Sequence, residues 1–134
     1  MQKSRRSWVL LVPAVMTAAV VSLSLGNALQ LKPEIFRFPG ADKAHHLLAY
    51  GCLGVTWTTA LRYAGDELGG GDWTRGGWPL WLALFALGTL MEVLQWTSYP
   101  GRYFELADML ANAIGSTLGV FGYAWLLRTF PPKT

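Results

Sequence analysis

The chain has 134 residues, which is enough for one domain, 1–134, and no change of composition marks a second. Hydrophobic residues make up 52% and charged residues only 14%, whereas about a quarter of a soluble domain is charged. The low fraction of charged residues predicts an integral membrane protein. The net charge of +3 comes from scattered basic residues without a basic run, so no nucleic-acid partner is expected.

Long charge-free stretches predict transmembrane helices. A bilayer core takes about 20 mostly apolar helical residues, and each stretch with its flanks is roughly that long. Several Trp and Tyr residues fall near the ends of these segments, where amphipathic rings favour the headgroup level. The four stretches are Ser7 to Leu31, Ala44 to Leu61, Gly76 to Met91 and Met109 to Leu127.

The first stretch follows Lys3, Arg5 and Arg6, so it resembles both a retained helix and a cleaved secretory signal over residues 1–26. Because the uncharged run continues to Leu31, we expect a retained helix. Residues 26–43 then form a connecting loop.

The remaining elements are three helices. The second is expected from about Asp42 to Arg62, followed by a Gly-rich exposed loop from Arg62 to Gly77. The third is expected from about Trp78 to Tyr99, with Pro79 in its first turn, and the fourth from about Glu105 to Arg128. Between them, Tyr99-Pro100-Gly101-Arg102 predicts a tight turn. The expected fold is an all-α membrane bundle of four transmembrane helices.

The distribution of basic residues predicts an orientation. With four spans, both termini and the Gly-rich loop share one side, which carries seven Lys and Arg residues against four on the other. The positive-inside rule therefore predicts that both termini lie in the cytoplasm.

Polar residues gather at the opposite side, where the second and fourth helices begin and the third ends. Residues three or four apart share a helix face, so each helix presents one polar stripe. With a rise of about 1.5 Å per residue, Glu92 and Asn112 lie about 10 Å and Tyr50 about 12 Å below the surface, so the stripes meet at one level. The stripes are Asp42, His46 and Tyr50; Glu92, Gln95 and Tyr99; and Asp108, Asn112 and Gly115.

A carboxylic acid facing lipid costs about 2.5–3.5 kcal/mol even on a lenient insertion scale. Glu92 should therefore face the bundle interior, protonated or paired with Arg102, Lys43 or His46. The residues expected to bind a ligand in this cluster are Asp42, Lys43, His46, Tyr50, Glu92, Gln95, Arg102, Asp108 and Asn112.

The same residues resemble the VanZ-like family over about residues 40–122. The matching motifs, in order, are Asp42-Lys43 with His46 and Tyr50, Glu92-x-x-Gln95, Pro100-Gly101-Arg102, and Asp108 with Asn112 and Gly115. The resemblance implies a helical bacterial membrane protein of the cell envelope, in a family associated with resistance to the glycopeptide antibiotic teicoplanin. It implies no particular reaction.

Plainer interpretations stand beside these. Asp42 and Glu105 are expected to cap helices. His46 is favoured as an interhelical hydrogen-bonding residue over a metal ligand. Asp42, His46, Glu92 and Asp108 offer metal-ligand types, but their spacing is unlike a dedicated zinc motif, so we expect no metal and no other cofactor. The small residues Ala111, Gly115 and Gly119 predict helix packing, or contact with a second copy or another membrane protein.

Three functions remain open. The favoured one is binding of an anionic membrane lipid or cell-wall lipid precursor through Arg102, Lys43 and His46. The second is catalysis on a lipid-linked substrate, with Glu92 or His46 moving a proton and Arg102 stabilising negative charge. The third is a structural subunit in which the polar cluster only specifies the fold. We expect a non-enzymatic role.

Overall fold

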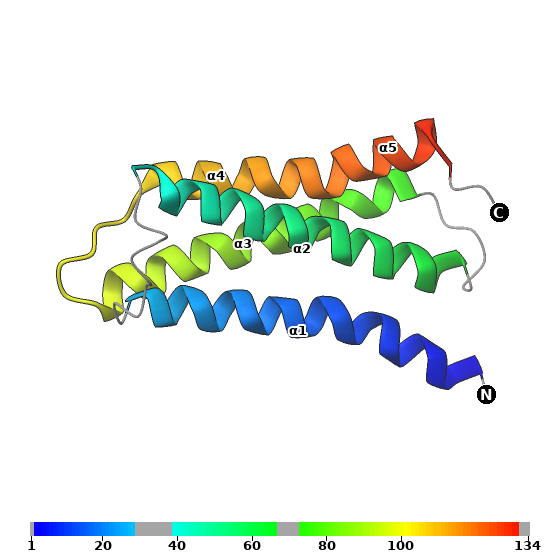
Figure 1. The fold of residues 1–134 in the computed structure, drawn as a ribbon, viewed down its shortest axis with the longest axis horizontal. Coiled ribbons are helices and arrows are strands. Elements are labelled where there is room, and N and C mark those ends of the chain that lie inside the picture. The colour runs from blue at the N-terminus through cyan, green and yellow to red at the C-terminus, as the bar shows by residue number, and fades with distance from the viewer. Residues whose placement is uncertain (1, 29–38, 67–72, 132–134) are drawn as a thin grey trace.

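The protein is a bundle of long antiparallel helices in the computed structural model, which describes residues 2–28, 39–66 and 73–131 (Figure 1). The elements are α1 (Gln2–Ala28), α2 (Ala41–Asp66), α3 (Trp73–Ser98), α4 (Leu106–Thr117), the short π-helix η2 (Leu118–Gly122) and α5 (Tyr123–Thr129). The last three form one continuous rod, so the described residues make four rods. The all-helical prediction is confirmed.

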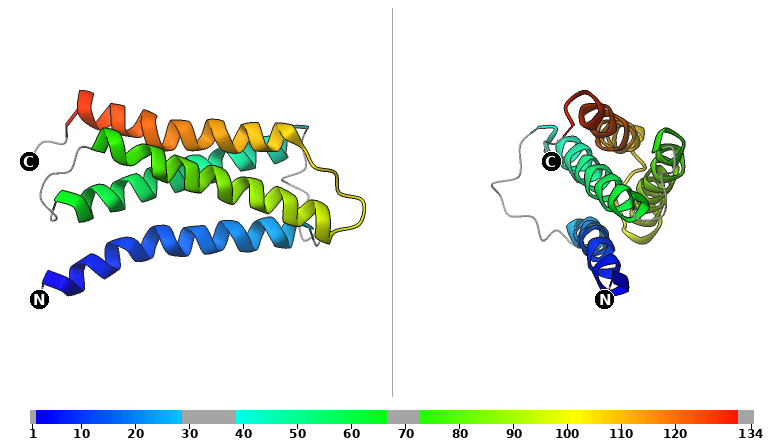
Figure 2. Two further views of the ribbon diagram at one scale, coloured as in Figure 1. Left: turned by 180° about the vertical axis from the view of Figure 1, so that it is seen from behind. Right: turned by 90° about the vertical axis from the view of Figure 1, so that its right-hand side faces the viewer.

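Three of the rods are long and apolar enough to cross a membrane. Within the described part of the chain, these spans are Trp8–Gly26, Gly77–Ser98 and Leu106–Thr129. α2 does not qualify by composition, although it is 26 residues long. A physical reason is that α2 packs against α1, α3 and α4, so it needs less lipid-compatible surface (Figure 2). The protein is thus a membrane protein, and the fourth span stays a prediction.

The predicted boundaries shift by a turn or so. α2 continues to Asp66, four residues beyond the expected end, and α3 begins at Trp73 instead of Trp78. Pro79 therefore lies inside α3 and not in its first turn. Of the predicted Gly-rich loop, Arg62 to Gly77, both ends are helical, and residues 67–72 lie outside the described residues. The added residues 63–66 and 73–77 include Gly, Thr and charged residues, and their helical hydrogen bonds satisfy backbone groups that a loop would leave to water. The tight turn is confirmed: Arg102 N–H donates to Tyr99 O at 3.3 Å, and Gly101 has φ of 84°.

The first helix is part of the bundle. Its Met16 and Val20 pack on the buried core of Tyr50, Leu53, Leu84 and Val120. Trp57 Nε1 donates a hydrogen bond to Thr17 Oγ1 at 3.1 Å, and Gln95 Nε2 donates to Ser24 O at 2.7 Å. α1 thus contributes to the core and accepts hydrogen bonds from two side chains of α2 and α3. Its retention in the mature protein stays a prediction.

Glycines set the closest helix contact. A β-carbon at Gly115 would overlap with the carbonyl oxygen of Leu47, and one at Gly119 would overlap with that of Gly51. The small-residue stripe therefore packs against α2 within the protomer, as the packing interpretation predicted.

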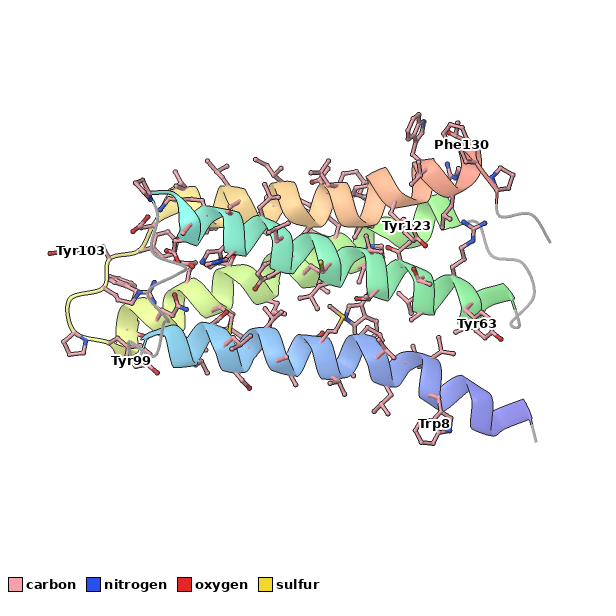
Figure 3. The ribbon with its side chains drawn as sticks, in the orientation of Figure 1. Trp8, Tyr63, Tyr99, Tyr103, Tyr123 and Phe130 are labelled. Atoms are coloured by element: carbon pink, nitrogen blue, oxygen red, sulfur yellow. The ribbon has the colours of Figure 1, made fainter. Side chains whose placement is uncertain are left out.

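Aromatic residues mark the two ends of the bundle (Figure 3). Tyr99 and Tyr103 lie at the end where α2 begins and α3 ends, called the polar end below. Trp8, Tyr63, Tyr123 and Phe130 lie toward the opposite end, where α1 begins and α5 finishes. Two aromatic bands about a helix bundle are typical of residues at the two membrane interfaces.

Candidate functional site: a buried polar cluster around His46

His46 is the centre of the polar end. Its Nδ1 lies 2.9 Å from Asn112 Oδ1, an acceptor, so Nδ1 carries the proton in this arrangement. Nε2 then faces two acids, 3.7 Å from Glu92 Oε1 and 3.8 Å from Asp108 Oδ2. One imidazole on α2 thus joins side chains from α3 and α4, as the three polar stripes predicted.

The acids and the amide around His46 are almost completely buried. Glu92 is 3% exposed, and Asp108 and Asn112 are each 1% exposed. Glu92 therefore faces the bundle interior and not the lipid, and of the three partners expected for it, His46 is the one at ion-pair distance among the described residues. The arrangement holds two carboxylates within 4 Å of one ring nitrogen, where each can accept from a protonated imidazole or bind a cation.

Lys43 closes the cluster at its solvent side. Its Nζ lies 2.5 Å from Glu105 Oε2 and 3.3 Å from Asp108 Oδ1, with the side chain 41% exposed. The hydrogen bond that Lys43 Nζ donates to Glu105 raises the pKa of Lys43 above its ordinary 10.5, although desolvation opposes this. The expected capping role of Glu105 is wrong: its carboxylate makes no cap hydrogen bond at α4 because it binds Lys43 instead.

Other predicted site residues lie at the margins. Gln95 is buried but donates to α1, so it belongs to a helix contact and not to the His46 cluster. Tyr50 is buried one turn beyond His46, and its hydroxyl has no hydrogen-bond partner among the described residues. Arg102 follows the turn and is half-buried, and its charge attracts the Glu92 carboxylate.

Asp42 lies in the first turn of α2, one turn before His46. Ligand atoms from Asp42, His46 and Asp108 all lie within 4.8 Å of one another. The fold thus brings together metal-ligand types that are far apart in sequence, as the converging polar stripes predicted.

The family comparison agrees with this constellation. A family model described as VanZ/LLP1 matches residues 1–128. The chain belongs to the VanZ/LLP1 family. The match covers every helix from α1 to nearly the end of α5, more than the 40–122 over which the motifs resemble it. The comparisons with curated proteins and with solved structures found no match.

Gly88 of this VanZ/LLP1 chain supports the cluster, although the sequence analysis did not identify it. A β-carbon at Gly88 would lie 2.7 Å from Asn112 Nδ2, so the glycine makes room for the amide that holds His46. Ser116 is fully buried one turn beyond Asn112. The signal for Gly88 was its place one turn before Glu92, on the same face of α3.

Proposed function

We propose that this VanZ/LLP1 protein binds the anionic headgroup of a membrane lipid or cell-wall lipid precursor at its polar end, with Arg102 as the cation that contacts the headgroup. Arg102 is half-buried at the end of the Tyr99–Arg102 turn and directly precedes Tyr103, an aromatic residue of the polar end. A guanidinium matches phosphate and carboxylate oxygens through paired donors.

The observation that carries the proposal is that the two cations of the cluster, Lys43 and Arg102, differ in their ion pairing. Lys43 is engaged by Glu105 and Asp108. Among the described residues, no acid lies at ion-pair distance from the Arg102 guanidinium. Arg102 can therefore take an external anion without breaking an ion pair of that part of the chain.

Lipid retention after purification tests this role. Wild type, Arg102→Ala and Arg102→Lys are extracted in mild detergent, exchanged into vesicles of phosphatidylglycerol or phosphatidylcholine, and compared by native mass spectrometry. Arg128→Ala, in the last turn of α5, is the matched control at the opposite end. We expect selective loss of phosphatidylglycerol in Arg102→Ala, partial retention in Arg102→Lys, and no change in Arg128→Ala. Equal retention by Arg102→Ala and wild type would refute the proposal.

The biological setting follows from orientation. The excess of basic residues at the opposite side favours a bacterial inner-membrane protein whose polar end faces outward. There a bound lipid precursor would be less accessible to a glycopeptide such as teicoplanin. Expression of wild type should raise the teicoplanin concentration that inhibits growth, and Arg102→Ala should not. An impermeant maleimide should label Tyr103→Cys and not Phe130→Cys in intact cells; the reverse pattern would place the polar end in the cytoplasm.

A second function is favoured by the geometry of His46. Its ring is held by Asn112 and faces two buried acids, an arrangement suited to proton transfer on a lipid-linked phosphate or glycan, with Arg102 stabilising negative charge. Glu92→Gln should then abolish turnover while the thermal stability of the protein is kept. Loss of stability together with all activities would instead favour a purely structural cluster.

A further inference from the structure

The donor atoms around His46 Nε2 have the composition of a metal site. Asp42 and His46 lie one turn apart on α2, Asp108 comes from α4, and their ligand atoms are mutually within 4.8 Å. Glu92 Oε1, from α3, adds a further oxygen 3.7 Å from the same nitrogen. Three helices therefore place an imidazole and three carboxylates close together.

The spacing resembles that of ligands around an ion more than that of hydrogen-bonded pairs. Atoms 2.0–2.2 Å from a tetrahedral zinc ion lie roughly 3.3–3.6 Å from one another. The distances from Nε2 to Glu92 and Asp108, 3.7 Å and 3.8 Å, exceed that spacing by a few tenths of an ångström. They are too long for direct hydrogen bonds.

His46 is also oriented as metal-binding histidines are. Its Nδ1 donates to Asn112 Oδ1, which leaves the Nε2 lone pair of the neutral ring directed at the acids. Such a second partner fixes the tautomer and the ring plane of a ligating imidazole. Gly88 makes room for the amide that does this.

Glu92 supplies an independent sign of a missing cation. Its side chain is 97% buried, with a relative exposure of 3%, and Oε1 has no hydrogen-bond partner among the described residues. This unpartnered oxygen points at His46 Nε2, from within a membrane-spanning segment. A carboxylate in that position needs a proton or a cation.

We propose that Asp42, His46 and Asp108 bind a divalent transition metal of the zinc class, with Glu92 as a fourth ligand or as acceptor for a metal-bound water. A mixed imidazole and carboxylate set suits zinc or manganese better than calcium or magnesium, which prefer oxygen alone. Lys43 does not block the site, because it faces Asp108 Oδ1 while Oδ2 faces His46. The sequence expectation of no metal is the alternative that the experiment below tests.

Zinc binding by untagged protein tests the site. Protein in detergent is stripped with a chelator, dialysed, and titrated with Zn²⁺ by calorimetry. We expect a single ion per chain in wild type and in His45→Gln, because residue 45 is turned by about 100° from His46 around α2. His46→Gln and Asp108→Asn should lose binding, and Asn112→Ala should weaken it about 10- to 100-fold because the imidazole loses its orienting partner.

Folding and geometry are checked separately. Zn²⁺ should raise the thermal unfolding temperature of wild type and of no variant that lacks a ligand. X-ray absorption of the wild-type zinc complex should give only nitrogen and oxygen neighbours at about 2.0–2.2 Å, a result that does not depend on any variant folding. Equal zinc binding by wild type, His46→Gln and Asp108→Asn, or a sulfur neighbour from Cys52, would overturn the proposal.

Discussion

Substituting Gly88 by alanine tests whether the buried cluster depends on close packing. The new β-carbon would lie 2.7 Å from Asn112 Nδ2 and 3.1 Å from Asn112 Cβ and Cγ. Asn112 cannot move freely, because it is buried and bonded to His46. Overpacking costs about 1–3 kcal/mol, and a lost hydrogen bond about 0.5–1.5 kcal/mol. The better helix propensity of alanine returns at most about 1 kcal/mol. We expect a net destabilisation of about 0.5–3.5 kcal/mol.

The control is Gly26→Ala in α1, where the added carbon meets nothing within 4 Å, so stability should stay level or rise slightly. Both variants are measured by equilibrium unfolding in mixed micelles of dodecylmaltoside and SDS. The same Gly88 change is then made in an Asn112→Ala background, where the nearest clashing atom is gone and the penalty should shrink. If Gly88→Ala is as stable as Gly26→Ala, or its penalty persists without the amide, the packing explanation is wrong.

The α2–α4 contact should respond unequally to its glycines: Gly115→Ala clashes with a backbone carbonyl and should lower the unfolding temperature far more than Gly51→Ala, whose added carbon stays 3.6 Å from its neighbour. Equal effects would contradict the observed register. Lys43→Met should cost stability at neutral pH. Because the pKa of Lys43 is raised above 10.5 on folding, its stabilising effect is complete below pH 10.5 and is lost as pH rises through the folded-state value, so the wild-type advantage over Lys43→Met should narrow there. If the stability difference between wild type and Lys43→Met stays constant above pH 10.5, packing and not the charge of Lys43 explains the difference. Gln95→Leu removes the hydrogen bond to Ser24 and should weaken the packing of α1 by about 0.6 kcal/mol, the average for an interhelical hydrogen bond in a membrane. Proteolysis within α1 should become faster while the His46 cluster stays intact.

The membrane class and the convergence of the polar stripes could be predicted from sequence because both follow from strong constraints. Charge-free runs must match the bilayer, and antiparallel threading places the start of α2, the end of α3 and the start of α4 at one side. A buried acid must face inward, which is where Glu92 lies. The positive φ of Gly101 in the turn was similarly fixed by local backbone sterics.

The neighbours of individual side chains could not be predicted, because helix rotation is not fixed by spacing. Gln95 is three residues from Glu92, which turns it by about 60° around α3. That angle is enough for Glu92 to face His46 while Gln95 reaches α1. The partner of Lys43 is harder still to predict, because its long side chain can reach any acid near the start of α4. The acid that it binds is Glu105.

The α2 composition illustrates a second limit. The sequence predicted a fourth span from a charge-free run, yet α2 is less apolar than the other three rods. Its position among α1, α3 and α4 allows polar and small residues that a lipid-facing helix would exclude. The same freedom explains why α2 carries His46 and also Gly54, where an added β-carbon would lie 2.9 Å from Gly119 Cα. The least apolar helix is therefore the one that organises the candidate site.

The lipid and metal proposals use different atoms of one cluster, so their tests can fail separately. Arg102 lies beside the turn and is not among the metal-ligand types, whereas His46 and Asp108 lie below it between the helices. Arg102→Ala should lose phosphatidylglycerol and keep zinc. His46→Gln should lose zinc, and headgroup binding should persist if Arg102 alone supplies the contact. Loss of both ligands in both variants, with folding intact, would mean that the metal and the headgroup share one site, which would join the two roles in a single metal-assisted binding of the anion.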